Sequence, residues 1–220
     1  MTNETIEQTI TFVKKALKGA EGGHDWFHIQ RVFQNAQSIA KTENVNLLIV
    51  SLSALLHDIA DAKFHNGDES IGPRMASEFL ASIKVEQQVI DHVVQIIENI
   101  SFKSSLRDEN NMRKPFNSLE LQVVQDADRL DAIGAIGIAR AFNYGGFKNR
   151  ELYNPEISPN LNMSKEEYKK STAPTINHFY EKLLLLKGKM NTDTGKNIAE
   201  SRHQYMLDFL IQFDKEWNGL

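Results

Sequence analysis

An apolar helix that ends in ionisable side chains constrains this chain more than any other feature. Residues 47–54 are apolar except for two serines, and a helix without a polar face belongs inside a bundle. His57 and Asp58 follow after two leucines, and Asp61 comes one turn later. An unpaired charge at the end of a buried helix is costly, and a divalent metal ion suits one imidazole and one carboxylate. A capping Asp beside a core His explains this stretch alone equally well.

The composition places the chain among ordinary globular proteins and limits the kind of metal site. The 220 residues are 41% hydrophobic and 25% charged, enough for one domain or a tightly joined pair with a sizeable core. A net charge of -4 and a pI near 6.0 argue against a general nucleic-acid coat. The chain has no cysteine, which excludes disulfides and thiolate ligands. Any metal must therefore be held by His, Asp or Glu, and the expected ions are hard or borderline.

The first residues of the sequence do not resemble a secretory signal. Residues 1–7 are polar and acidic where a secretory signal has a basic and then an apolar stretch. No apolar run reaches the length of a membrane span. We expect a cytoplasmic protein without a membrane partner, and a homodimer stays open.

Apolar residues at helical spacing predict an all-α fold without strands. We expect a single domain over residues 1–220, a helical bundle with a core at 20–142 and a C-terminal helical extension at 164–217. Irregular segments are expected at 100–117 and 143–163. The first helix is expected to end near Gly19. The next four are expected to begin at Asp25, 47, Pro73 and 85, and a sixth to run from Ser118 through Ile136. Two further helices are expected to begin at Ser164 and at Thr192 or Thr194.

Three separated helices carry candidate ligands that a bundle can bring together. The order is His28, then His57 and Asp58, then an Asp in the acidic segment 126–131. His28 opens His-Ile-Gln-Arg-Val-Phe, the doublet stands in Leu-Leu-His-Asp-Ile-Ala, and the last acid stands in Ala-Asp-Arg-Leu. These motifs closely resemble those of the HD-domain metal-dependent phosphohydrolase superfamily. The whole chain is also similar to a bacterial subfamily of small stand-alone HD proteins.

The resemblance implies an HD-type helical bundle and a metal site within it. Carried over by position, His28, His57, Asp58 and Asp128 would be the metal ligands. Asp126 is the alternative to Asp128, because residues two apart on a helix do not face one point. Asp128 is preferred because it precedes Arg-Leu as in the family pattern. Asp61 is the candidate general acid or base, since several HD enzymes have an acid at that offset.

Other polar side chains are candidates for contacting a phosphorylated substrate. Each also has a simpler explanation, as a solvated cation, a helix cap or a core histidine. If His65 and His92 were ligands, the centre would be binuclear. The candidates are Lys103, Arg129, His24, His65 and His92.

The expected activity is hydrolysis of a phosphoester or phosphoanhydride bond in a nucleotide-like substrate. The cofactor would be a divalent ion, with Mn, Mg, Co, Ni and Fe all open. Some relatives in the subfamily are implied to be nucleoside triphosphate pyrophosphohydrolases. The alternatives are a phosphodiesterase acting on cyclic or oligonucleotides, a non-catalytic nucleotide sensor and a di-iron oxygenase.

Overall fold

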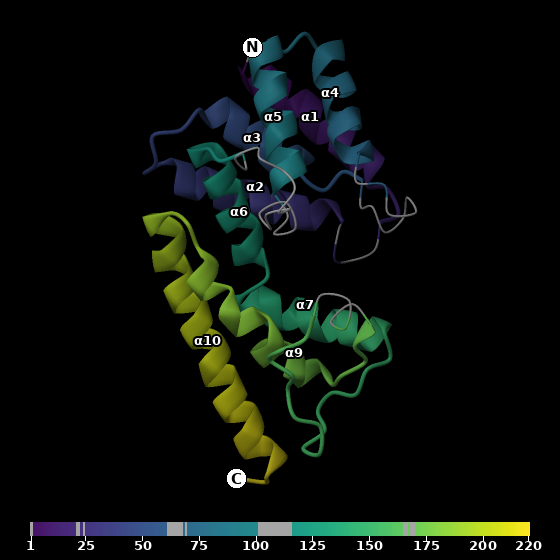
Figure 1. Cartoon of the computed structure of the whole chain (residues 1–220), viewed down its shortest axis with the longest axis vertical. Helices are drawn as coiled ribbons and strands as arrows, with labels where there is room; N and C mark the ends of the chain where they lie inside the picture. The colour runs from purple at the N-terminus through teal and green to yellow at the C-terminus, as the bar shows by residue number, and fades with distance from the viewer. Residues whose placement is uncertain are drawn as a thin grey trace. The chain divides into compact units, whose positions relative to one another are not determined.

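The chain folds into helices, as expected from the sequence. The computed structural model describes residues 2–20, 23, 25–60, 68, 70–100, 116–164, 167 and 170–220, and it shows no strand within these ranges (Figure 1). The all-α prediction is confirmed. Two compact units divide the chain, Met1–Asp128 and Arg129–Leu220. The single-domain description and its boundaries stay predictions.

The N-terminal unit is built around a short buried helix. This helix, α3, buries eight of its ten residues, from Ile49 to Leu56. It packs against α1, α2 and α5, while α4 packs against α5. An almost wholly apolar helix needs neighbours on every side. The helices of this unit are α1 (Thr2–Ala16), α2 (Trp26–Ala40), α3 (Leu47–Leu56), α4 (Ile71–Ser82), α5 (Gln87–Asn99) and the larger part of α6 (Leu119–Asp131).

Side-chain caps fix where the two central helices begin. Asp25 accepts a hydrogen bond from the backbone N–H of His28 at 3.0 Å, which confirms the expected start of α2. Asn46 accepts from the N–H groups of Leu48 and Ile49 and so starts α3. Both caps satisfy amide groups that the first turn leaves without an intrahelical partner.

The helix expected from Ser118 through Ile136 is two helices, and that prediction is wrong. α6 ends at Asp131, Ile133 is extended, and α7 (Gly134–Phe147) begins at a glycine with φ of +75°. The apolar spacing continues across the break, so periodicity could not reveal it. A positive φ favours glycine because a Cβ is strained there.

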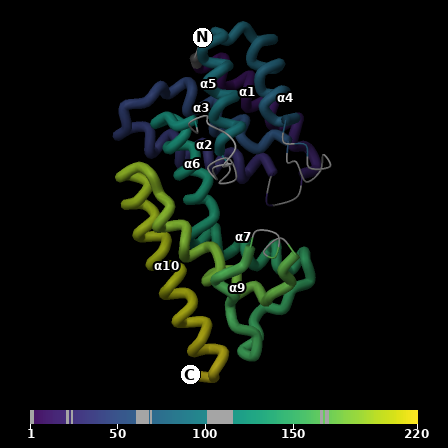
Figure 2. Tube along the Cα trace, in the orientation of Figure 1, coloured from purple at the N-terminus to yellow at the C-terminus, as the bar shows by residue number. Residues whose placement is uncertain are grey.

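The C-terminal unit combines α7 with shorter helical pieces and one long helix. The irregular segment expected from Asn143 begins later, because α7 continues to Phe147. The expected capping box is present: Ser164 and Glu167 exchange side-chain to backbone hydrogen bonds. Thr192 caps the last helix by accepting from Gly195 N–H. The remaining elements are α9 (Thr175–Glu181), the 3₁₀ turns η3 (Leu183–Leu185) and η4 (Lys187–Lys189), and α10 (Asp193–Trp217) (Figure 2).

Aromatic side chains form the core between the helices of the C-terminal unit. Phe142 of α7 lies 5.9 Å from the rings of both Phe179 and Phe209, and the latter two are 5.8 Å apart. Such ring distances are typical of favourable aromatic pairs. They join α7, α9 and α10 into one packed layer. Among the described residues, no helix has the combination of length and apolarity that crossing a membrane requires.

Gly145 permits the close approach of α7 to the start of α9. A Cβ at this position would overlap the Oγ1 of Thr175, which is itself buried. The neighbouring Gly146 has no atom within 4 Å of a Cβ built in the same way. A side chain is therefore excluded at position 145 and has room at position 146.

This contrast predicts opposite effects of two alanine substitutions. Gly145→Ala should lower the free energy of unfolding by about 1–3 kcal/mol through overpacking. Gly146→Ala should raise it by up to about 1 kcal/mol, because alanine is the better helix former. Urea unfolding followed by circular dichroism measures both. Equal effects of the two substitutions would contradict the close contact at Thr175.

The partly buried His178 predicts a loss of stability in acid. Burial, followed by the positive charges of Lys182 and Arg150, lowers its pKa from 6.5 to about 4. The unfolded chain then takes up this proton first as the pH falls, so stability is lost between pH 6.5 and pH 4. From pH 7 to pH 5 the contribution is about 2 kcal/mol. The free energy of unfolding, measured at pH 7 and at pH 5, should therefore fall less in His178→Gln than in the wild type, by the contribution of this histidine. An equal fall in the two proteins would refute the assignment.

Candidate metal centre

Three of the expected ligands come together in the N-terminal unit. His28 lies in the first turn of α2, His57 follows the last residue of α3, and Asp58 is next to it. One ligand atom from each of the three lies within 4.8 Å of the others. Among the described residues this is the group of His, Asp and Glu side chains arranged to hold a metal ion.

Asp128 of α6 brings a second carboxylate to the two imidazoles. Its Oδ1 lies 3.6 Å from Nε2 of His28 and 3.9 Å from Nε2 of His57. Ligand atoms bound at about 2.1 Å around one tetrahedral ion are about 3.4 Å apart. The observed spacing is slightly wider, so a small inward movement of these side chains would bring them to coordination distance.

A backbone contact selects the tautomer of the neutral His57 ring. Its Nδ1 lies 2.9 Å from the carbonyl oxygen of Ala54, one turn earlier in α3. A carbonyl oxygen only accepts, so Nδ1 carries the proton and donates it. In the neutral ring the lone pair is then on Nε2, the atom that faces Asp128. A hydrogen bond of this kind orients metal-binding histidines and raises their basicity.

The group has a buried side and an open side. His28 is 3% exposed, and the side chain of His57 is 5% exposed. Their rings meet edge to face, with centroids 5.5 Å apart. The side chain of Asp128 is 43% exposed. Solvent and a small ligand can therefore approach the carboxylate, while the imidazoles are held by the core.

Asp126 and Asp128, the two acids weighed against each other in the sequence, have different surroundings. Asp126 is fully buried, whereas Asp128 lies beside the two histidines. Residues two apart on a helix point in different directions, which agrees with the different exposure of the two carboxylates. Metal binding by Asp128 itself remains a prediction.

A contact that the sequence did not reveal joins the helices that carry His28 and Asp128. The side-chain amide of Asn35, in α2, donates to the carbonyl oxygen of Ala127, in α6, at 3.2 Å. Asn35 stands beside the buried Ala36 and Ile39. A polar residue next to an apolar stripe was the only sequence signal for this contact.

The remaining candidates divide into those the structure describes and those it does not. Asp61, His24, His65 and Lys103 lie outside the described residues. His92 is described, and its Nε2 lies 3.0 Å from Ser118 Oγ and 3.6 Å from Glu120. Arg129 donates to the carbonyl oxygen of Lys189 at 2.6 Å. These neighbours of His92 are not among the candidate metal ligands. The substrate contacts of His92 and Arg129 remain predictions.

The donor set fits a divalent ion of the borderline class. Two imidazole nitrogens and two carboxylates suit Mn, Fe, Co, Ni or Zn, and a site richer in oxygen would favour Mg or Ca. The burial of the imidazoles favours a partner for them, since polar groups without one are costly in the core.

Comparisons with known proteins agree with this arrangement. The HD domain family model matches residues 26–133, which include all four candidate ligands. A crystal structure of an HD-superfamily hydrolase from Bacillus thuringiensis superimposes with a TM-score of 0.80 and 44% identity, covering 100% of both chains.

Two further relatives are connected with nucleotides, one through a crystal structure and one through its name. YpgQ of Bacillus subtilis is 39% identical over 97% of this chain and 94% of its own. Its crystal structure in complex with ADP superimposes with a TM-score of 0.73 and 36% identity, covering 98% of this chain and 97% of that one. A deoxyguanosinetriphosphate triphosphohydrolase-like protein of Caldanaerobacter subterraneus is 25% identical over 86% of this chain and 64% of its own.

HD domains bind divalent metal ions, and the His–His–Asp group described above lies inside the matched region. The similarity to the solved hydrolase and to YpgQ extends over almost the whole length of each chain. This chain therefore belongs to the HD-domain family and has the fold of the HD-superfamily hydrolases.

Proposed function

We propose that this protein is a metal-dependent phosphohydrolase that cleaves a phosphoester or phosphoanhydride bond of a nucleotide. The observation that carries the proposal is the convergence of His28, His57 and Asp58, with Asp128 3.6 Å from the first of them. A nucleoside triphosphate pyrophosphohydrolase is the specific form we favour. A cytoplasmic location remains a prediction from the sequence, which left a homodimer open.

His28, His57, Asp58 and Asp128 would hold the ion. A divalent ion bound there would supply Lewis acidity to phosphate oxygens and to a nearby water. His57 contributes a ring whose proton is fixed on Nδ1 by Ala54, so its Nε2 is available as a ligand. Asp128, the exposed member, would lie on the side where substrate enters.

The proposed nucleotide substrate is supported by the relatives. YpgQ was crystallised with ADP, and the relative from Caldanaerobacter has a name that refers to deoxyguanosine triphosphate. Asp61 is the proposed general acid or base, three residues beyond Asp58. Phosphate-binding roles for Lys103, Arg129, His24, His65 and His92 complete the proposal.

Removal of a ligand should separate metal binding from folding. In EDTA-treated protein titrated with Mn²⁺, His57→Ala should weaken binding at least about 100-fold, because one donor to the ion is lost. The helical circular dichroism signal should stay close to that of the wild type. Isothermal titration calorimetry gives the affinity.

His92→Gln is the matched control for this titration. Its ring contacts Ser118 and Glu120, so the affinity for Mn²⁺ should be unchanged. If His57→Ala binds as the wild type does, the assigned ligands are wrong. If His92→Gln weakens binding as strongly as His57→Ala, His92 belongs to the centre.

Activity should depend on the metal and on Asp61. We expect EDTA to abolish hydrolysis and Mn, Mg, Co, Ni or Fe to restore it to different degrees, in assays with nucleoside mono-, di- and triphosphates and cyclic dinucleotides. Asp61→Asn should lower kcat by about 10²- to 10⁴-fold and keep the metal affinity. Loss of metal in this variant would make Asp61 a ligand instead.

The products identify the reaction. Pyrophosphate release indicates a pyrophosphohydrolase, orthophosphate release indicates a phosphatase, and a linear monophosphate from a cyclic dinucleotide indicates a phosphodiesterase. Nucleotide binding without turnover under every metal would contradict the enzyme and favour a sensor.

A further inference from the structure

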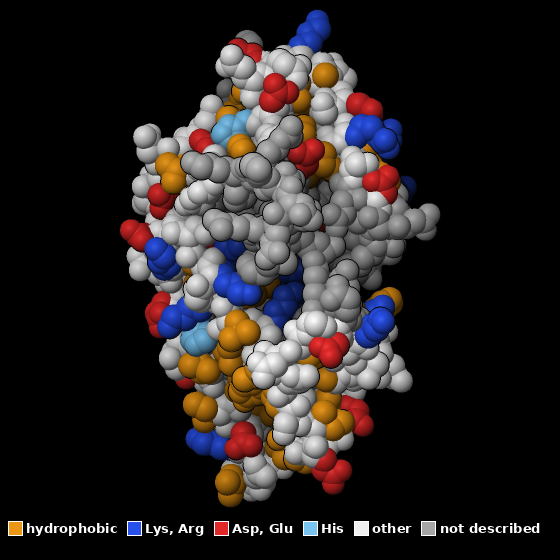
Figure 3. All heavy atoms as spheres, in the orientation of Figure 1, with side chains coloured by type: hydrophobic (Ala, Val, Ile, Leu, Met, Phe, Trp, Pro, Cys, Tyr) orange, Lys and Arg blue, Asp and Glu red, His pale blue; other side chains and the backbone are white. Residues whose placement is uncertain are grey.

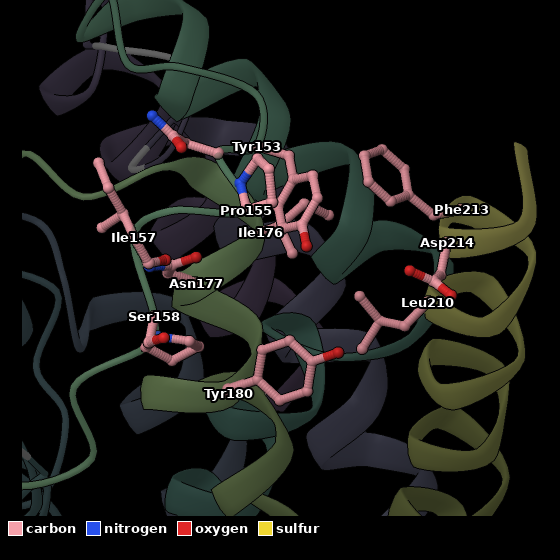
Figure 4. Close-up of a pocket in the computed structure, with 12 residues that line it drawn as sticks. Tyr153, Pro155, Ile157, Ser158, Ile176, Asn177, Tyr180, Leu210, Phe213 and Asp214 are labelled. Atoms are coloured by element: carbon pink, nitrogen blue, oxygen red, sulfur yellow. The ribbon is translucent and has the colours of Figure 1, made fainter. Parts of the chain in front are cut away.

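The C-terminal unit contains a pocket that the proposed hydrolysis does not use. The pocket has a volume of about 380 Å³, and its twelve lining residues come from α9, α10 and the segment 153–159 (Figure 4). This volume falls within the range of small-ligand sites. On the face drawn in Figure 3, hydrophobic side chains gather over this unit.

Aromatic rings form much of the pocket wall. Tyr153, Tyr180 and Phe213 line it, together with the aliphatic Leu210. Tyr153 meets Phe213 edge to face at 5.8 Å, and the ring of Trp217 supports Tyr153 from 4.9 Å. These contacts hold the rings in place before any ligand binds. Aromatic faces attract organic cations and provide apolar area for the rest of the ligand.

The polar groups of the pocket include an amide, a carboxylate and hydroxyl groups, all of which can accept hydrogen bonds. Asn177 is 1% exposed and uses its amide nitrogen to donate to the carbonyl oxygen of Ile157 at 2.8 Å, so the amide contributes an oxygen to the wall. Asp214 adds a carboxylate, and Figure 4 shows it facing the same space as the hydroxyl groups of Tyr153 and Tyr180. A ligand rich in donors matches this set.

The charge of the pocket has one sign. None of the twelve described lining residues is Lys, Arg or His. Among the described residues Asp214 makes no ion pair, and Asn218 donates to its Oδ1 at 3.2 Å. Burial raises the pKa of Tyr180, and the nearby Tyr153 and Asp214 raise it further. An additional negative charge is therefore disfavoured in this space, and a positive charge is favoured.

We propose that this pocket binds a small organic ammonium ion with an apolar body, its charged group beside Asp214 and the rings of Tyr153, Tyr180 and Phe213 around the remainder. The carboxylate of Asp214 would pair with the ammonium group. This site goes beyond the proposed hydrolysis, and neither depends on the other.

Three probes of similar size and different charge test the proposal. Calorimetry on the full-length chain compares 2-phenylethylammonium, the neutral 2-phenylethanol and the anion 3-phenylpropanoate. We expect the ammonium probe to bind about tenfold tighter than the alcohol and the anion to bind weakest. Equal affinities for the three probes, or no binding of the ammonium probe, would overturn the proposal.

Two substitutions on α10 locate the charged contact. Asp214→Asn keeps the shape of the side chain. It should lower the affinity for the ammonium probe about tenfold and leave the affinity for the alcohol unchanged. The control is Asp208→Asn on the same helix, where the exposed carboxylate accepts from Gln204 outside the pocket. It should bind all probes as the wild type does. An Asp214→Asn protein that is folded by circular dichroism and keeps the wild-type preference for ammonium would refute the role of Asp214.

Discussion

The burial of α3 is the constraint on which the N-terminal unit depends. Its last eight residues are buried, so α1, α2 and α5 must enclose it. A helix held on every side has a fixed end as well as fixed faces. His57 follows that end directly and bonds back to Ala54, so the core determines where its Nε2 lies. The position of His57 in the candidate metal centre is thus a consequence of hydrophobic packing. Side chains from α2 and α6 complete the centre.

Much of this arrangement could be predicted because the necessary information is local in the sequence. An apolar run followed by His57 and Asp58 is visible without any structure, and so are the cap at Asp25 and the capping box at Ser164. The all-α class follows from apolar spacing over many turns. The family resemblance then related His28 and Asp128 to the same centre, a relation that spacing alone does not supply.

The parts that could not be predicted depend on backbone conformation or on contacts between distant residues. The break between α6 and α7 rests on the positive φ of Gly134, while the apolar pattern runs on across it. The burial of Asp126 and the exposure of Asp128 depend on the direction in which each residue of α6 points. Asn35 bonds to a backbone oxygen 92 residues later. The acceptor-lined pocket of the C-terminal unit gathers residues that share no motif.

The fit between Gly145 and Thr175 bears on how this chain can evolve. Because the hydroxyl of Thr175 occupies the space of a side chain at position 145, mutations at the two positions are not independent. A larger residue at 145 becomes tolerable only after position 175 has become smaller or the two segments have moved apart. Among descendants of this sequence, the two positions should therefore change together, whereas position 146 should drift freely.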